Sequence, residues 1–110
     1  MIAAGTDSVF PFDPMLNVWG FATRQTKDAG VQGHGEAIDV ETALRLYTSA
    51  GARLSGEQTR LGALEPGMLA DVVAYPRDPL DIPIDDLPSL QPAFTIVGGL
   101  PAHDPQGLLG

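Results

Sequence analysis

The residues able to do metal or acid–base chemistry are few and far apart in this chain. Asp7 follows the short apolar stretch Met1–Ala4, and a carboxylate there could accept a proton or bind a metal ion. His34 lies between two glycines, and His103 stands beside Asp104. A catalytic zinc site usually needs three protein ligands and a water molecule. Taken alone, these positions favour a turn-capping role for Asp7 and exposed loop positions for both histidines.

Composition excludes several classes of function. The chain has 110 residues, enough for one small domain, with 14 acidic against 6 basic residues and a formal charge of −8. A negative surface repels phosphate backbones, so we expect no nucleic-acid partner. There is no cysteine, which excludes disulfides and thiolate chemistry. Neither a signal peptide nor an apolar run long enough for a membrane span is present, so we expect a soluble cytoplasmic protein without a membrane partner.

The patterns around these residues predict two helices. Asp13 is a potential N-cap, Pro14 suits the first helical position, and we expect this helix to run to about residue 29, where Gly30 supplies a stop. Asp39 is the next predicted N-cap, for a continuous helix over residues 40–54. The expected apolar face of that second helix consists of Ala43, Leu44, Tyr47, Ala50 and Leu54.

Strands are expected at both ends of the chain. Residues 1–4 read as a short buried strand. After Arg60, a turn at residues 65–67 precedes two strand signals, residues 71–75 and 94–99. Residues 76–92 contain five prolines and no helical period, so we predict a loop. The tail after residue 100 has little pattern and is expected to lack regular structure.

Five segments in order resemble amidohydrolase family 3, which includes the N-substituted formamide deformylases. The segment Gly-Thr-Asp-Ser-Val-Phe-Pro-Phe-Asp-Pro at residues 5–14 looks like the last barrel-strand motif of that family. Ala-Thr-Arg at 22–24 and the stretch 36–52 resemble its following helices. Residues 62–73 resemble the exit from the barrel, and residues 95–99 resemble the closing strand.

The resemblance implies a fold and a site. It implies a mixed α/β chain that forms the carboxy-terminal fragment of a TIM-barrel metal-dependent hydrolase. Residues 1–59 would end the barrel, residues 60–102 would form part of a small composite β-sandwich domain, and residues 103–110 would be a tail. Asp7 matches the family aspartate that binds or borders the metal, most commonly zinc, and handles the proton of the attacking water. The implied substrates are small molecules with amide or formamide carbon–nitrogen bonds.

The departures from the family pattern limit what the chain can do alone. The His-x-His pair, the bridging carboxylate or modified lysine and the middle-strand histidines are absent. We therefore expect the isolated chain to bind no metal and to be inactive, with the remaining barrel supplied by polypeptide that precedes it. The alternatives are a non-catalytic binding or oligomerisation module, which we would expect to form a homodimer, and a degenerate reading frame without function.

The remaining candidate residues have structural interpretations. We expect Arg24 to pair with Glu36 or Glu57, and Asp71 to bond backbone N–H groups at the start of its strand. Trp19 and Tyr47 fall on apolar helix faces, which favours packing over ligand stacking. The residues expected to join the two helices are Leu16, Trp19, Leu44 and Tyr47.

Overall fold

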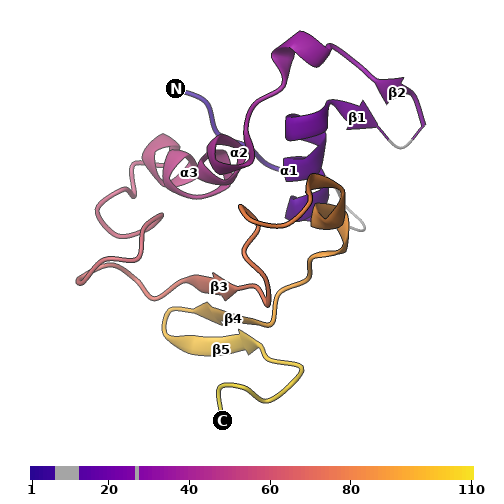
Figure 1. Cartoon of the computed structure of the whole chain (residues 1–110). Coiled ribbons are helices and arrows are strands. Elements are labelled where there is room, and N and C mark those ends of the chain that lie inside the picture. The colour runs from indigo at the N-terminus through magenta and orange to yellow at the C-terminus, as the bar shows by residue number, and fades with distance from the viewer. Residues whose placement is uncertain (7–12, 27) are drawn as a thin grey trace.

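The computed structural model describes residues 1–6, 13–26 and 28–110. Figure 1 shows the helices gathered on one side and a small sheet on the other, so the predicted mixed α/β class is confirmed. No closed barrel forms within the described residues. The elements in order are α1 (Pro14–Thr23), β1 (Gln25–Thr26), β2 (Gly30–Val31), η1 (His34–Glu36), α2 (Val40–Tyr47), α3 (Ser49–Leu54), β3 (Val72–Ala74), η2 (Ile84–Ser89), β4 (Phe94–Val97) and β5 (Leu100–His103).

Helix α1 begins as predicted and ends earlier than predicted. The Asp13 carboxylate accepts the N–H of Met15 at 2.9 Å and caps the first turn. The helix stops at Thr23 because Arg24 takes a left-handed conformation, with φ of 58°, and donates its N–H to the carbonyl of Gly20 at 2.8 Å. The chain then reverses in the β1–β2 hairpin, so the predicted helix to residue 29 was wrong.

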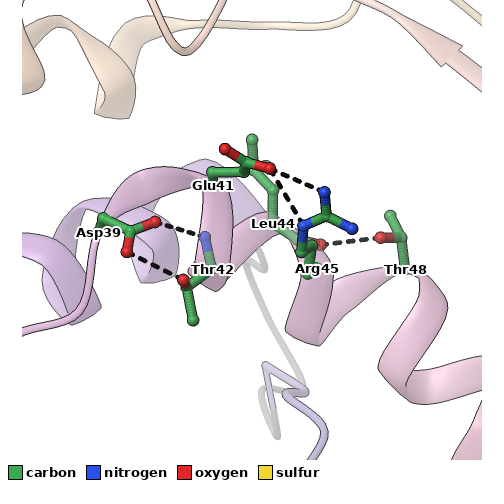
Figure 2. Close-up of polar contacts among 6 residues, drawn as sticks. All are labelled: Asp39, Glu41, Thr42, Leu44, Arg45 and Thr48. Atoms are coloured by element: carbon green, nitrogen blue, oxygen red, sulfur yellow. Dashed lines mark hydrogen bonds and ion pairs between the residues drawn. The ribbon is translucent and has the colours of Figure 1, made fainter.

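The predicted second helix is two helices. Figure 2 shows the start of α2, where the Asp39 carboxylate accepts the backbone N–H and the hydroxyl of Thr42 at 2.7 and 2.9 Å. At Thr48 the backbone leaves helical geometry, with φ −116° and ψ −96°, while its hydroxyl donates to the carbonyl of Leu44. Helix α3 starts afresh after this break. Its last residue, Leu54, is 62% exposed, so its predicted place on a buried face was wrong.

The core lies between α1, α2 and η2. Its buried members are Met15, Val18, Ala43, Leu87 and Leu90. Two of these belong to the segment predicted as a loop without helical character. That prediction was wrong because the 3-10 helix η2 carries Leu87, which is fully buried, against α1.

The predicted helix contacts are partly confirmed. Trp19, Leu44 and Tyr47 are half-buried and pack against the core cluster. Leu16 is half-buried as well, but it is not part of that cluster. Residues Met15 and Val18, on the neighbouring stripe of α1, take the central positions instead.

The carboxy-terminal half forms a three-stranded antiparallel sheet in the order β3-β4-β5. Strands β3 and β4 confirm the two predicted strands, with Val72 opposite Ile96. Strand β5, in the region expected to lack structure, pairs with β4 through a turn at Gly98 and Gly99. That expectation was wrong because β4 offers β5 a backbone partner that the composition of the tail does not reveal.

Two shorter segments complete the description. The predicted turn at residues 65–67 is confirmed: Met68 donates its N–H to the Glu65 carbonyl at 3.1 Å, and Gly67 has φ of 92°. Residues 1–4 do not form the predicted buried strand. Met1 and Ile2 are exposed. The segment contacts α2 through the N–H of Ala4, which donates to the Leu46 carbonyl at 3.0 Å.

Candidate functional site

Asp7, the predicted metal-site aspartate, lies outside the described residues. The structure does place the residues that flank its segment. On one side, the backbone of Ala4 is bound to the carboxyl end of α2, and on the other, Asp13 begins α1. Gly5 lines a surface pocket together with Trp19, Arg24 and other residues of α1 and the β1–β2 hairpin. The described residues on both sides of Asp7 therefore lie on the helical side of the molecule.

The two histidines are not brought together. His34 lies in η1, next to the β1–β2 hairpin, and His103 ends β5, at the opposite end of the structure (Figure 1). Both side chains belong to exposed residues, as predicted. Neither histidine is therefore placed to act with the other.

The described residues do not fit a resident metal ion. Across residues 1–6, 13–26 and 28–110, no three His, Asp or Glu side chains gather where they could hold one. Zinc at a catalytic site takes three protein ligands, and the described part of the chain offers no such group. No catalytic step through a metal follows from these residues.

Arg24 holds the hairpin against the end of α1. Its guanidinium donates from Nε to the carbonyl of Gln32 at 2.9 Å and from Nη2 to the Glu36 carboxylate at 3.3 Å. The predicted structural ion pair is confirmed with Glu36, whereas Glu57 pairs with Arg60 at 2.8 Å. The guanidinium is thus used within the protein, which supports its structural interpretation.

Asp71 secures the turn between β4 and β5. Its carboxylate accepts the N–H of Gly98 at 2.7 Å, and the adjacent Ala70 carbonyl accepts the N–H of Gly99 at 3.0 Å. The prediction that Asp71 bonds backbone N–H groups is confirmed, although its partner is 27 residues away rather than local.

The aromatic residues of the helices pack and also form hydrogen bonds. Trp19 donates its indole N–H to the Asp85 carboxylate at 3.1 Å, and the Tyr47 hydroxyl accepts from the Asn17 side chain at 2.8 Å. The two bonds fasten η2 to α1 and α2 to α1, respectively. Both contacts agree with the packing role predicted for Trp19 and Tyr47.

A cleft between the helices and the sheet was not anticipated from the sequence. Its walls come from α1, α2, the segment after η2 and strand β3, and most of its lining is apolar. Tyr75, just after β3, and Asp13, the cap of α1, both line it. Burial, followed by the negative charge of Asp13, raises the pKa of the Tyr75 phenol.

The cleft was missed because its walls are separated along the chain. The signal available was the presence of apolar residues within the proline-rich segment, of which Leu90 lines the cleft. The sequence pattern does not show which distant elements these apolar residues contact.

None of the described helices is long and apolar enough to cross a membrane.

Comparison with known proteins gives consistent results. The family model described as "Amidohydrolase family" matches residues 1–103. The chain is 30% identical to the N-substituted formamide deformylase of Arthrobacter pascens over 96 residues, which is 87% of this chain and 18% of that enzyme. It is 38% identical to the 5-methylthioadenosine/S-adenosylhomocysteine deaminase of Teredinibacter turnerae over 68 residues, which is 62% of this chain and 15% of that enzyme. The chain thus spans less than a fifth of either relative. No solved structure matches it.

Proposed function

The chain belongs to the amidohydrolase family, and on this premise we propose that it is the carboxy-terminal part of a metal-dependent hydrolase of non-peptide carbon–nitrogen bonds. The observation that carries the proposal is the family match over residues 1–103, combined with coverage of only 18% of the deformylase. The printed activities of the two relatives point to small-molecule substrates, of which formamides and other amides are the first class to test.

In this proposal the chain supplies the end of the barrel and part of the β-domain. Residues 1–59 would complete the barrel, residues 60–102 would belong to the composite domain, and residues 103–110 would follow it. One feature supports such a division: strands β3–β5 bury no residue fully and leave Val97 and Leu100 exposed. Exposed apolar side chains of this kind are expected where further polypeptide covers them. The buried core spans the boundary, because Leu87 and Leu90 of the second part pack with residues of α1 and α2.

Asp7 is the residue that we propose for the site. The match of residues 1–103 to the family model and the resemblance of residues 5–14 to the family's last barrel-strand motif support this assignment, although residues 1–4 form no strand here. Zinc is the proposed metal of the longer enzyme, held by ligands that this chain lacks, and the isolated chain is proposed to be inactive. Two measurements on the purified chain test this: calorimetry with zinc and an assay on N-substituted formamides. Tight stoichiometric zinc binding, or turnover that disappears in Asp7→Asn, would contradict it.

A chimeric enzyme tests whether this chain can supply the carboxy-terminal part of an active hydrolase. The matching 18% of the Arthrobacter pascens deformylase is replaced by this chain, and formamide hydrolysis is measured. We expect a stable chimera to retain activity and Asp7→Asn within it to lower kcat by about 10²–10⁴-fold, the usual size of an acid–base contribution. Asp28→Asn, the same charge change in the exposed β1–β2 turn, is the matched control and should leave kcat unchanged. If the chimera folds and both variants have the same kcat, the proposed catalytic role of Asp7 is wrong.

The second candidate is a non-catalytic binding or oligomerisation module. The exposed apolar residues of the sheet favour it, since self-association would cover them. Analytical ultracentrifugation of the purified chain distinguishes the two, because a module of this kind should form a discrete dimer, whereas a detached piece of a barrel should not. The DNA upstream of this sequence offers an independent check, since the proposed enzyme requires an encoded His-x-His motif there.

A further inference from the structure

The cleft between the helices and the sheet, here named the interlayer cleft, has the properties of a ligand site. Its volume is about 980 Å³. The walls are formed by Leu16 and Leu44 on the helical side and by Val73 on the sheet side, with Leu90 between them. Pockets that bind small molecules are commonly concave, mostly apolar and of this size, with a few polar groups that set orientation.

The charge in the interlayer cleft has one sign. Asp13 is the charged residue among the described residues that line it, and no Lys, Arg or His is present in that lining. The Asp13 carboxylate accepts from the N–H of Met15 and, at 3.3 Å, from the side-chain amide of Gln91. A carboxylate has about four acceptor positions, so further donors can still bind.

The start of α1 weakens this charge without cancelling it. A helix N-terminus carries the equivalent of roughly +0.5 charge, against the full negative charge of Asp13. The raised pKa of the Tyr75 phenol, caused by burial and then by Asp13, agrees with a net negative potential in the cleft. Tyr47 and Tyr75 add aromatic faces to the lining, and such faces attract cations.

We propose that the interlayer cleft binds a hydrophobic ammonium ion, with its apolar tail between the helices and the sheet and its cationic head at Asp13. The complementarity is both of charge and of surface. An anion of the same shape would meet the Asp13 carboxylate without a compensating cation. A neutral molecule would gain the apolar contacts alone. The proposal is independent of the hydrolase function, because it uses none of the residues assigned to that reaction.

Three probes with one tail test the proposal: octylammonium, octanol and octanoate. Each is titrated into the 110-residue chain near physiological ionic strength, and binding is followed by amide chemical shifts of Leu44, Val73 and Tyr75. We expect octylammonium to bind roughly tenfold more tightly than octanol, as one charge-assisted contact allows, and octanoate to bind most weakly. Equal affinities, or the absence of saturable shifts at these three residues, would overturn the proposal.

Asp13→Asn identifies the charge responsible. Asparagine is as good an N-cap as aspartate, so α1 should be retained, which circular dichroism verifies. We expect the affinity for octylammonium to fall to that for octanol, which itself stays unchanged. Asp28→Asn controls for attraction by the overall charge of −8 and should have no effect on any probe. An equal loss in both variants would assign the preference to net charge and would refute the role of Asp13.

A second copy of the chain is the competing occupant. Analytical ultracentrifugation without probe, combined with hydrogen exchange at Leu44 and Val73, detects it. A dimer that protects these residues and excludes octylammonium would show that the interlayer cleft is a subunit interface, contrary to the proposal. The order of affinities of the three probes is measured on the unaltered chain. The proposal can therefore still be tested if Asp13→Asn fails to fold.

Discussion

The helical part of this molecule buries its side chains far more completely than the sheet does. Helices α1 and α2 and the 3-10 helix η2 contribute four of the five residues of the buried core cluster, and Leu90, directly after η2, is the fifth. In β3, β4 and β5 every residue is half-buried or exposed. The helices are therefore held by apolar packing. The sheet depends on backbone pairing and on the hydrogen bond from the Gly98 N–H, in the β4–β5 turn, to the Asp71 carboxylate. This difference shows that the sheet leaves more of its apolar surface uncovered than the helices do.

The largest effect should come from the helical core. Leu87→Ala removes a side chain with 0% exposure, so we expect the free energy of unfolding to fall by about 3 kcal/mol. Leu100→Ala, at a side chain 72% exposed in β5, should change it by less than about 0.5 kcal/mol. Urea denaturation measures both. Similar losses would mean that the sheet has a covered face and that the contrast between the two regions is false.

The next effect concerns the loop that leads from the helices to the sheet. Gly62 has φ of 91°, and a Cβ there would lie 2.8 Å from the Ala52 Cβ and 3.0 Å from the Ser49 Cα. We expect Gly62→Ala to cost about 2 kcal/mol, through backbone strain and displacement of α3. Gly98 has φ of 58° and open space around it, so Gly98→Ala introduces backbone strain without a steric clash. It should cost about 1 kcal/mol. Thermal melts compare them, and a larger loss at Gly98 would place the critical turn in the sheet.

A smaller effect should be confined to the sheet. Asp71→Ala removes the acceptor of the Gly98 N–H, which should cost about 1 kcal/mol. Native-state hydrogen exchange should show faster exchange at Gly98 and in β4 and β5, with α1 and α2 unchanged. Asp71→Asn keeps a carbonyl acceptor and should lose less. If amides of α1 also exchange faster in Asp71→Ala, the two regions unfold together and are not separable.

The smallest effect should be confined to the helices and should depend on pH. Hydrogen bonds from the Thr42 backbone N–H and then from its hydroxyl lower the pKa of Asp39 below 3.8. Because the folded pKa is depressed, this stabilisation is present above the unfolded value and is lost as pH falls through the folded pKa. We expect the difference in Tm between the unaltered chain and Asp39→Asn to shrink as pH falls through that window. A difference that is constant with pH would show that the charge of Asp39 contributes nothing.

Local features of this fold were predictable where the interacting residues are neighbours. Asp13 and Asp39 each cap a helix through an N–H two or three residues away. The Pro66–Gly67 turn closes within four residues, and β3 follows from its β-branched run. The exposure of His34 was also predicted, although the structure places this residue in η1 and not in the expected loop.

Features that depend on distant partners were not predictable in this way. The left-handed Arg24 that ends α1 is held through Gln32, directly after β2, and Glu36, in η1. Leu87 appeared to lie in a proline-rich loop because its burial depends on α1, more than 60 residues earlier in the chain. The interlayer cleft has the same origin. The role of Asp7 rests on family resemblance and stays a prediction, since that residue lies outside the described part of the chain.

The amino-acid sequence by itself determined the family, the caps, the main turn and two of the strands, because these are encoded by short ordered motifs and by contacts within a few residues. It also determined that few metal-binding side chains are present. Tertiary structure alone decided where the helices end, that η2 completes the core, that the tail supplies a third strand, and that helices and sheet enclose a cleft. These outcomes depend on which apolar surfaces and backbone groups meet after long loops close, and that choice follows from the free energy of the whole chain.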